Sequence, residues 1–380
     1  MSTSKNQRIR NPSPPRRLSP AQRTKDENTD DDECSSSTAG TKLEEPRTSS
    51  DCIPGTAYSQ QFVLSALIDL TKELDALDGA NQPGNIELDP TLEEKLCNLW
   101  DMTLDSAVGS FLLRTEGLTS LFTNVISATS KPRLTEILIG IFANIITNIE
   151  VEQARQLCER PHVINVLAAS LSCRDTQTLV QLFRFLNGVL TENLWTNKWQ
   201  DSLLSNFDEL LTIIASSRND HLLNESARFV DQWLYDQHLD DDDGSRIPAD
   251  HIVSAVGCAL EECLTAKHVS TAMILLRVLY SLSTSQTGMQ ALLTNAEPQF
   301  VPTLLDTSLL VFSTADTHFR VGDVDELQLR CVKQLMMSLR DGWLLMKDSK
   351  PNNVENEYAV LEEQWTQLYE TALHHQHDKT

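Results

Sequence analysis

The sequence lacks the short motifs that mark most enzyme and metal sites. It has no phosphate-binding loop, nucleophile elbow, paired-histidine zinc helix or dinucleotide-binding fingerprint. Its eight cysteines are scattered over 380 residues without a CxxC pair, which argues against a zinc ribbon and a disulfide framework. No apolar run approaches the roughly 18 residues that a membrane span needs, and the N-terminus lacks the apolar core of a signal peptide. We therefore expect a soluble intracellular protein that is not an enzyme, with no catalytic residues, metal or cofactor.

Basic residues are also scarce. The chain has 31 lysines and arginines against 54 aspartates and glutamates, which gives a formal net charge of -23. A charge of this sign repels a phosphate backbone, so direct nucleic-acid binding is not expected. The acidic balance suggests a basic protein segment as one class of partner, although an acidic surface also serves solubility alone.

Large apolar residues are nearly absent from residues 1–50, which are rich in Ser, Pro and charged residues. Such a segment buries too little surface to offset the entropy of ordering the chain, so we predict a disordered tail. Ser13 and Ser19 each precede a proline, and Ser19 also follows two arginines, which makes both candidate phosphorylation sites. The same basic cluster, PPRRLSPAQRTK, is alternatively a nuclear import signal.

From residue 56 onward the apolar pattern is helical, and it repeats. Five apolar segments begin at residues 117, 162, 206, 252 and 300. A second apolar helix follows each of them, and this second family comprises RLTEILIGIFANII, TLVQLFRFLNGVL, NESARFVDQWL, TAMILLRVLYSL and QLRCVKQLMMSL. A step in the forties with two or three helices per unit is typical of armadillo and HEAT repeats. The sequence therefore predicts an all-α protein, an α-solenoid of about five armadillo/HEAT-type repeats.

The pattern divides the chain into four parts. These are the tail at 1–50, N-terminal capping helices at 51–115, armadillo-like repeats at 116–345, and a C-terminal capping helix with a frayed end at 346–380. A free coiled-coil arm is the alternative for the last helix, because its apolar residues step by three and four. Prolines support the helix starts, since a missing N–H costs nothing there. They are Pro90, Pro132, Pro161, Pro248 and Pro298.

The stretch CNLWDMTLDSAVGSFLL, residues 97–113, contains the only Trp-Asp pair of the chain. Apolar residues at three- and four-residue steps from Leu96 to Phe111 predict one face of an amphipathic helix, with Asp101 on the opposite face. No strand-rich blade surrounds the pair, which excludes a β-propeller. We predict that Trp100 packs in the core rather than lining a ligand pocket.

Two further clusters resemble metal sites only in part. The run LDDDDGSRI, residues 239–247, matches some positions of a calcium-binding loop but has Leu239 at the first ligand position. The histidines of the terminal HHQHDKT have no acidic or cysteine ligand fixed nearby. We predict a solvated acidic loop and a frayed tail at these places.

Asn144 and Asn187 lie 43 residues apart at equivalent places in the second helix family, and Gln232 follows at the next such place. An asparagine at this point in armadillo proteins lines the concave groove, where its amide can both donate to and accept from an extended peptide. We predict these three residues as peptide-groove residues. Tryptophan is missing four residues before each asparagine, where Gly140 and Phe183 stand. The alternative is that the asparagines tie one helix to the next inside the stack.

Four stretches of the chain resemble the serum amyloid A-like 1 family, a group of armadillo-like proteins. They are NPSPP and DCIPGTAYS at residues 11 and 51, LWDMTLDSAVGSFL at 99, and KPRLTEILIGIFANI at 131. The likeness is specific over residues 51–150 and diffuse afterward.

The resemblance implies a non-enzymatic interaction scaffold connected with promoting cell proliferation. It implies a nuclear protein, and we expect the cytoplasm as a second compartment. The repeat array itself predicts a protein or peptide partner. The competing hypotheses are a transport adaptor for basic peptide segments and an all-helical enzyme with a non-motif active site.

Overall fold

The computed structural model describes residues 51–78, 87–236 and 248–294, together with scattered helical positions between 300 and 341. Several predictions lie outside these residues and stay predictions. They are the tail at 1–50 with Ser13 and Ser19, the acidic loop at 239–247, and the C-terminal cap with its histidines at 346–380. Extended pairing within the described residues is limited to one isolated bridge between Cys52 and Ser59.

Helices follow one another in a repeating order along the chain. Three complete sets of three helices are α3–α5, α6–α8 and α9–α11, and α12 and α13 correspond to the last two helices of the next set. The helices are α1 (Gln60–Asp78), α2 (Pro90–Met102), α3 (Ser106–Arg114), α4 (Leu118–Ala128), α5 (Pro132–Asn148), α6 (Val151–Cys158), α7 (Pro161–Ala169), η1 (Ser170–Ser172), α8 (Thr176–Thr191), α9 (Asn197–Leu204), α10 (Phe207–Ser216), α11 (Asp220–Asp236), α12 (Ala249–Ala266), α13 (Val269–Ser283) and α14 (Gln286–Thr294).

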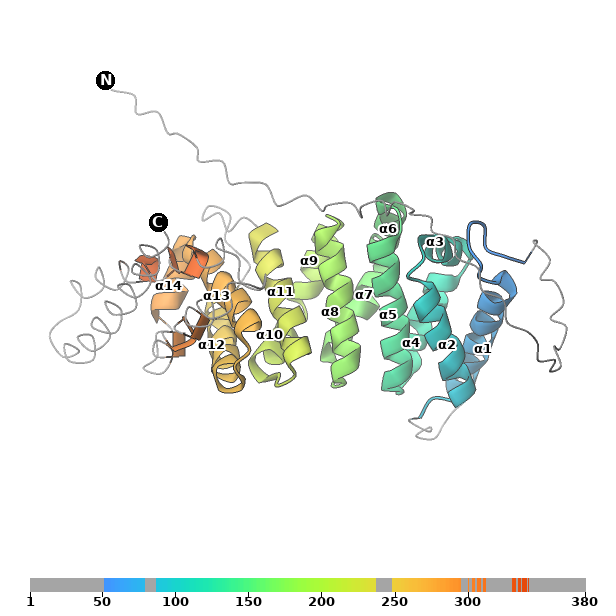
Figure 1. The fold of residues 1–380 in the computed structure, drawn as a ribbon, viewed down its shortest axis with the longest axis horizontal. Helices are drawn as coiled ribbons and strands as arrows, with labels where there is room; N and C mark the ends of the chain where they lie inside the picture. The colour runs from blue at the N-terminus through green and yellow to red at the C-terminus, as the bar shows by residue number, and fades with distance from the viewer. Residues whose placement is uncertain are drawn as a thin grey trace, which may run out of the picture. The chain divides into compact units, whose positions relative to one another are not determined.

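The helices form layers, of which one is continuous (Figure 1). In this layer, which we call the α5 layer, α2 packs on α5, α5 on α8, α8 on α11, and α11 on α13. Behind it α4 packs on α7 and α10 packs on α12. The short helices contact both, since α3 packs on α5 and α6 packs on α5 and α7. The predicted all-α solenoid of armadillo type is confirmed.

Capping residues explain where several helices begin. Pro90, Pro132 and Pro161 are the first residues of α2, α5 and α7, as predicted from their missing N–H groups. Asp89 accepts hydrogen bonds from two backbone N–H groups of α2, those of Thr91 and Leu92, both at 3.0 Å.

One predicted helix is in fact two. The apolar steps from Leu96 to Phe111 predicted a single helix, but α2 ends at Met102 and α3 begins at Ser106. The carboxylate of Asp105 accepts the N–H of Ala107 at 2.9 Å and so caps α3. Leu104, expected on the apolar face, lies in the break and is 60% exposed.

The core runs without interruption through successive sets of helices. In α5 every residue from Glu136 to Ile146 is buried. A chain of ring contacts with centroids 5.4 to 6.5 Å apart links Phe122, Phe142, Phe185, Trp199, Trp195, Phe229, Trp233 and Phe207. Each set of helices therefore buries its apolar faces against the next, which is how repeat proteins gain stability.

Candidate functional site

Asn144 of α5 is buried, with 3% of its surface exposed. Its Nδ2 donates to the backbone oxygen of Trp100 at 3.0 Å and to Oγ1 of Thr103 at 3.3 Å. Its Oδ1 accepts from Nη2 of Arg184 on α8 at 3.2 Å. Asn144 thus joins the end of α2 to α5 and α8, as the helix-tying alternative requires. Peptide binding by Asn144, which needs a free amide, stays a prediction.

Asn187 and Gln232 occupy the corresponding places on α8 and α11 and are half-buried. Nδ2 of Asn187 donates to the backbone oxygen of Glu225 at 3.1 Å and to its Oε2 at 2.8 Å. Oδ1 of Asn187 is buried and has no partner among the described residues. Oε1 of Gln232 accepts from Oγ1 of Thr191 at 3.4 Å. Both residues therefore contact the adjacent helix of the α5 layer, and their peptide-groove role stays a prediction.

Arginines make the equivalent contacts at the two ends of this layer. Arg133 on α5 donates through Nε to Glu93 of α2 at 2.7 Å and through Nη1 to Glu136 at 2.8 Å. Arg277 on α13 donates to the carboxylate of Asp231 on α11. Asp231 is 8% exposed, and burial raises its pKa to about 6 although Arg277 acts in the opposite direction.

Together these side chains form what we call the polar seam of the α5 layer. It comprises Glu93, Arg133, Glu136, Asn144, Arg184, Asn187, Glu225, Arg228, Asp231 and Arg277. Its four carboxylates are matched by four guanidinium groups, so the seam is neutral within a chain of net charge -23. A basic segment placed on the seam would meet no carboxylate without a polar partner.

Trp100 lies against Gly140, the residue that stands where armadillo proteins carry a tryptophan. A Cβ atom at Gly140 would be 2.3 Å from two ring atoms of Trp100, Cε2 and Cζ2. The indole thus comes from the neighbouring helix α2 and covers α5 at that position. Trp100 is half-buried and packs on the core, which confirms the predicted packing role.

The remaining chemistry-bearing groups of the described residues form neither a metal site nor a membrane span. No three His, Cys, Asp or Glu side chains there are grouped as metal ligands would be. No described helix is long and apolar enough to cross a membrane. Burial raises the pKa of Cys158 and of Cys263 to about 12, which keeps these thiols protonated.

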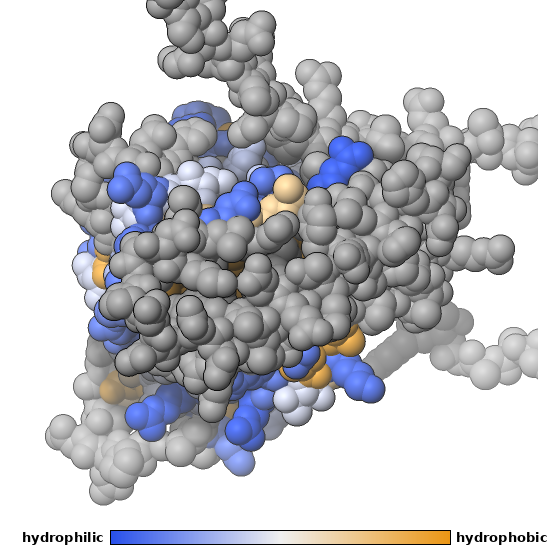
Figure 2. All heavy atoms as spheres, turned by 90° about the vertical axis from the view of Figure 1, so that its left-hand side faces the viewer, coloured by the Kyte–Doolittle hydropathy of each residue, from blue (hydrophilic) through white to orange (hydrophobic). Residues whose placement is uncertain are grey.

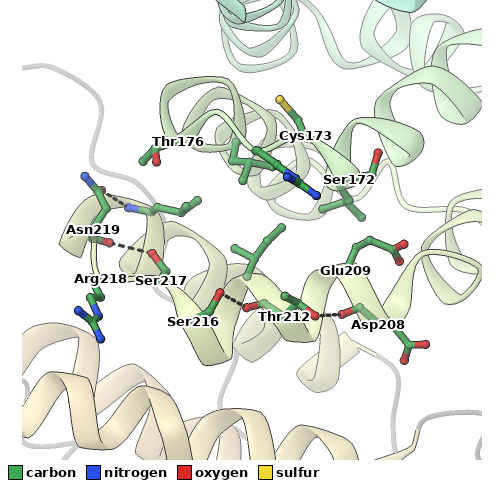
Figure 3. A pocket seen from close by; sticks show the side chains of 15 residues that line it. Ser172, Cys173, Thr176, Asp208, Glu209, Thr212, Ser216, Ser217, Arg218 and Asn219 are labelled. Atoms are coloured by element: carbon green, nitrogen blue, oxygen red, sulfur yellow. Dashed lines mark hydrogen bonds between the residues drawn. The ribbon is translucent and has the colours of Figure 1, made fainter.

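The surface seen at the α14 end of the stack is mostly hydrophilic where residues are described, with hydrophobic side chains only here and there (Figure 2). A pocket of about 590 Å³ opens elsewhere, between η1, α8, α10 and the start of α11. Its floor is apolar and its rim carries hydroxyl and charged side chains (Figure 3). The sequence does not reveal this pocket, because its walls come from helices and connecting residues of two different repeats.

These features define the class of protein: a helical repeat array in which each long helix is tied to the next by polar side chains as well as by apolar packing. Two solved structures are similar to this chain. An engineered protein aligns over 72% of this chain and 98% of its own, with a TM-score of 0.43 and 12% identity. A designed armadillo repeat protein in complex with the peptide (KR)4 aligns over 71% and 99%, with a TM-score of 0.42 and 11% identity.

Sequence comparisons confirm the resemblance to the serum amyloid A-like 1 family. A family model for the SAAL1 C-terminal domain matches residues 207–309. Protein SAAL1 of Homo sapiens is 28% identical over 193 residues, which are 49% of this chain and 40% of that protein. Protein SAAL1 of Mus musculus is 25% identical over 351 residues, which are 86% and 71%. Protein saal1 of Danio rerio is 26% identical over 261 residues, which are 64% and 54%.

The chain spans between 40% and 71% of the lengths of these three relatives. The family model matches a region, 207–309, in which the motifs quoted for the resemblance do not occur and the likeness was expected to be diffuse. The family likeness therefore extends beyond the short motifs into the region of α10 to α14.

Proposed function

We propose that this chain is a non-enzymatic interaction scaffold. It presents to a protein partner the exposed side chains beside the polar seam, which we call the exposed face of the α5 layer; they are Asn148, Thr191, Arg228 and Tyr235. The observation that carries the proposal is the polar seam. It holds successive helices in register, so side chains on the exposed face keep fixed spacings over several repeats. A rigid array of this kind suits recognition of an extended or large surface.

The exposed groups next to the seam have the chemistry of an interface. Asn148 of α5 and Thr191 of α8 are exposed at the carboxyl ends of their helices and can hydrogen-bond a partner. Arg228 of α11 is exposed beyond its contact with Glu225, and Tyr235 of α11 is 57% exposed. Tyrosine and arginine are enriched among residues that dominate binding energy at protein interfaces.

The partner class, the compartment and the biological role are part of the same proposal. A basic segment is supported by the net charge of -23, and the neutral seam argues against a basic segment at that position. We propose a nuclear scaffold connected with cell proliferation, on the strength of the family resemblance. The N-terminal basic cluster with Ser19 is the proposed import signal.

The test uses the full chain fused to a proximity-labelling enzyme in cells. We expect a reproducible set of labelled proteins, part of which is lost in the double variant Arg228→Glu/Tyr235→Ala. The matched control is Arg114→Glu/Tyr58→Ala, which changes an exposed arginine and an exposed tyrosine outside the α5 layer. Equal labelling by wild type and the α11 double variant would refute the role of this face. A set that excludes nuclear proteins would refute the proposed compartment.

A further inference from the structure

A basic residue stands two positions before the first residue of three successive long helices. Arg174 precedes α8, Arg218 precedes α11, and Lys267 precedes α13. Because these helices pack side by side in the α5 layer, the three residues follow one edge of the stack. We call them the cation row.

The cation row has no ionic partner among the described residues. All three side chains are exposed, and none makes a hydrogen bond or an ion pair. The nearest acids along the chain are engaged elsewhere. Asp175 accepts from N and from Oγ1 of Thr178, both at 2.8 Å, and Asp220 lies 3.3 Å from Nδ1 of His268.

The preceding repeat differs at this place. Lys131, directly before α5, is 2.7 Å from the carboxylate of Glu73, and both side chains are largely buried. The free cations therefore begin at Arg174. Three unpaired cations in line stand out in a chain whose net charge is -23.

The pocket of about 590 Å³ lies between the first two members of the row. Arg174 and Arg218 both line it, and its floor is apolar. Figure 3 shows Arg218 beyond one end of α10 and Asp208 at the other end, with Glu209 extending into the space between α10 and η1. The lining of the pocket thus combines two members of the cation row, Arg174 and Arg218, with the acidic residues Asp208 and Glu209. The floor residues are Leu171, Leu179, Ile213 and Leu222.

We propose that the cation row binds an extended acidic segment of a protein partner, which places one apolar side chain in this pocket. Packed helices lie roughly 8–10 Å apart, and an extended chain in the polyproline II conformation advances about 3.1 Å per residue with three residues per turn. In that conformation every third side chain points to the same side, so an acidic residue at every third position matches one carboxylate to each cation. Guanidinium–carboxylate hydrogen bonds are charge-assisted and can be bidentate, which favours this partner chemistry. At physiological ionic strength charges beyond about 8 Å are largely screened, so the local cations outweigh the net charge of the chain.

This surface is the edge of the stack and not the exposed face of the α5 layer. The proposed binding of an acidic segment goes beyond the proposed function. If the cation row bound no acidic peptide, the proposed scaffold function of the α5 layer would not be affected. It also predicts a ligand of the opposite charge to the basic segment considered above.

The test is a binding titration of the full chain by fluorescence anisotropy. The probe is a labelled nine-residue peptide with glutamate at positions 1, 4 and 7 and leucine at position 3, capped at both ends. A peptide of the same composition with its three glutamates adjacent is the spacing control. We expect the spaced peptide to bind at least tenfold more tightly than the control peptide. Equal affinity for the two peptides, or no binding of the spaced one at millimolar protein, would overturn the proposal.

Variants then locate the site. Arg174→Gln/Arg218→Gln should weaken the spaced peptide at least tenfold without unfolding the protein, because both side chains are exposed and unpaired. Lys198→Gln on α9 removes an exposed cation outside the row and should leave affinity within twofold. Glu209→Gln removes a carboxylate that repels the ligand and should leave binding equal or tighter. An unaffected double variant, or equal losses in the double variant and Lys198→Gln, would refute the assignment to this edge.

Discussion

Replacing Asn144 by alanine should destabilise the fold. The substitution removes the hydrogen bonds to Trp100 and Thr103 and the one from Arg184. A net hydrogen bond contributes about 0.5–1.5 kcal/mol, and one that involves a charged group contributes about 1.5–3 kcal/mol. The loss is reduced because Arg184 keeps Gln181 and the Trp100 carbonyl keeps the Thr103 hydroxyl. Alanine also has the higher helix propensity, by about 0.5 kcal/mol. We expect a net loss of about 2 kcal/mol.

Chemical unfolding followed by circular dichroism measures this loss as a lower midpoint. Asn148→Ala is the matched control, because Asn148 lies one turn later on the same helix and is exposed. Its Nδ2 donates only to the Asn144 carbonyl and to the Thr147 hydroxyl, so we expect a change within about 0.5 kcal/mol. If Asn144→Ala were as mild as Asn148→Ala, the amide would not tie the helices together. A groove asparagine facing solvent would give that milder result.

Three further predictions concern packing, pH dependence and thiol chemistry. Gly140→Ala should lower the free energy of unfolding by about 1–3 kcal/mol, because the new methyl group would overlap the Trp100 ring. In a Trp100→Ala background most of this cost should disappear. An unchanged unfolding midpoint for Gly140→Ala would contradict the contact. Arg277→Ala should cost about 3 kcal/mol at pH 8, where it leaves a buried unpaired Asp231 carboxylate. The native pKa of Asp231 is about 6, against 3.8 for an unperturbed group, and loss of Arg277 raises it further. A raised native pKa means that the folded state holds the proton of Asp231 more tightly than the unfolded state does, so the free energy of unfolding falls as pH rises from about 4 to above 6. The loss of stability caused by Arg277→Ala should therefore be smaller at pH 5 than at pH 8. In native protein the exposed Cys258 should react with an alkylating reagent long before the buried Cys158 and Cys263 do. If mass spectrometry found Cys158 labelled as fast as Cys258, the burial of Cys158 would be refuted.

The layers of the fold were predictable because apolar spacing is a direct consequence of burial. The second residues of the first four repeated segments are all buried; they are Leu118, Val163, Phe207 and Val253. The break between α2 and α3 was missed although Asp105 followed by Ser106 is a helix-start signal, because the apolar steps run through it. Apolar spacing alone does not show that a capping residue such as Asp105 ends one helix and begins another.

The polar contacts were harder to predict, because they join residues about 40 positions apart. Asn144 and Asn187 were found at equivalent places, but their partners depend on how α2, α5, α8 and α11 pack against one another. The same holds for the cation row, since Arg174 and Arg218 become neighbours only when their two repeats stack. Repeat period predicts which positions correspond, and helix packing decides what each of them contacts.

The polar seam joins one repeat to the next, and a double-mutant cycle between Asn144 and Arg184 is its most direct test. The unfolding free energies of Asn144→Ala, Arg184→Ala and the double variant are compared with wild type. Because the Oδ1 of Asn144 and the guanidinium of Arg184 are in contact across α5 and α8, we predict a coupling energy of about 1 kcal/mol. Additive losses, with coupling below about 0.3 kcal/mol, would contradict the seam.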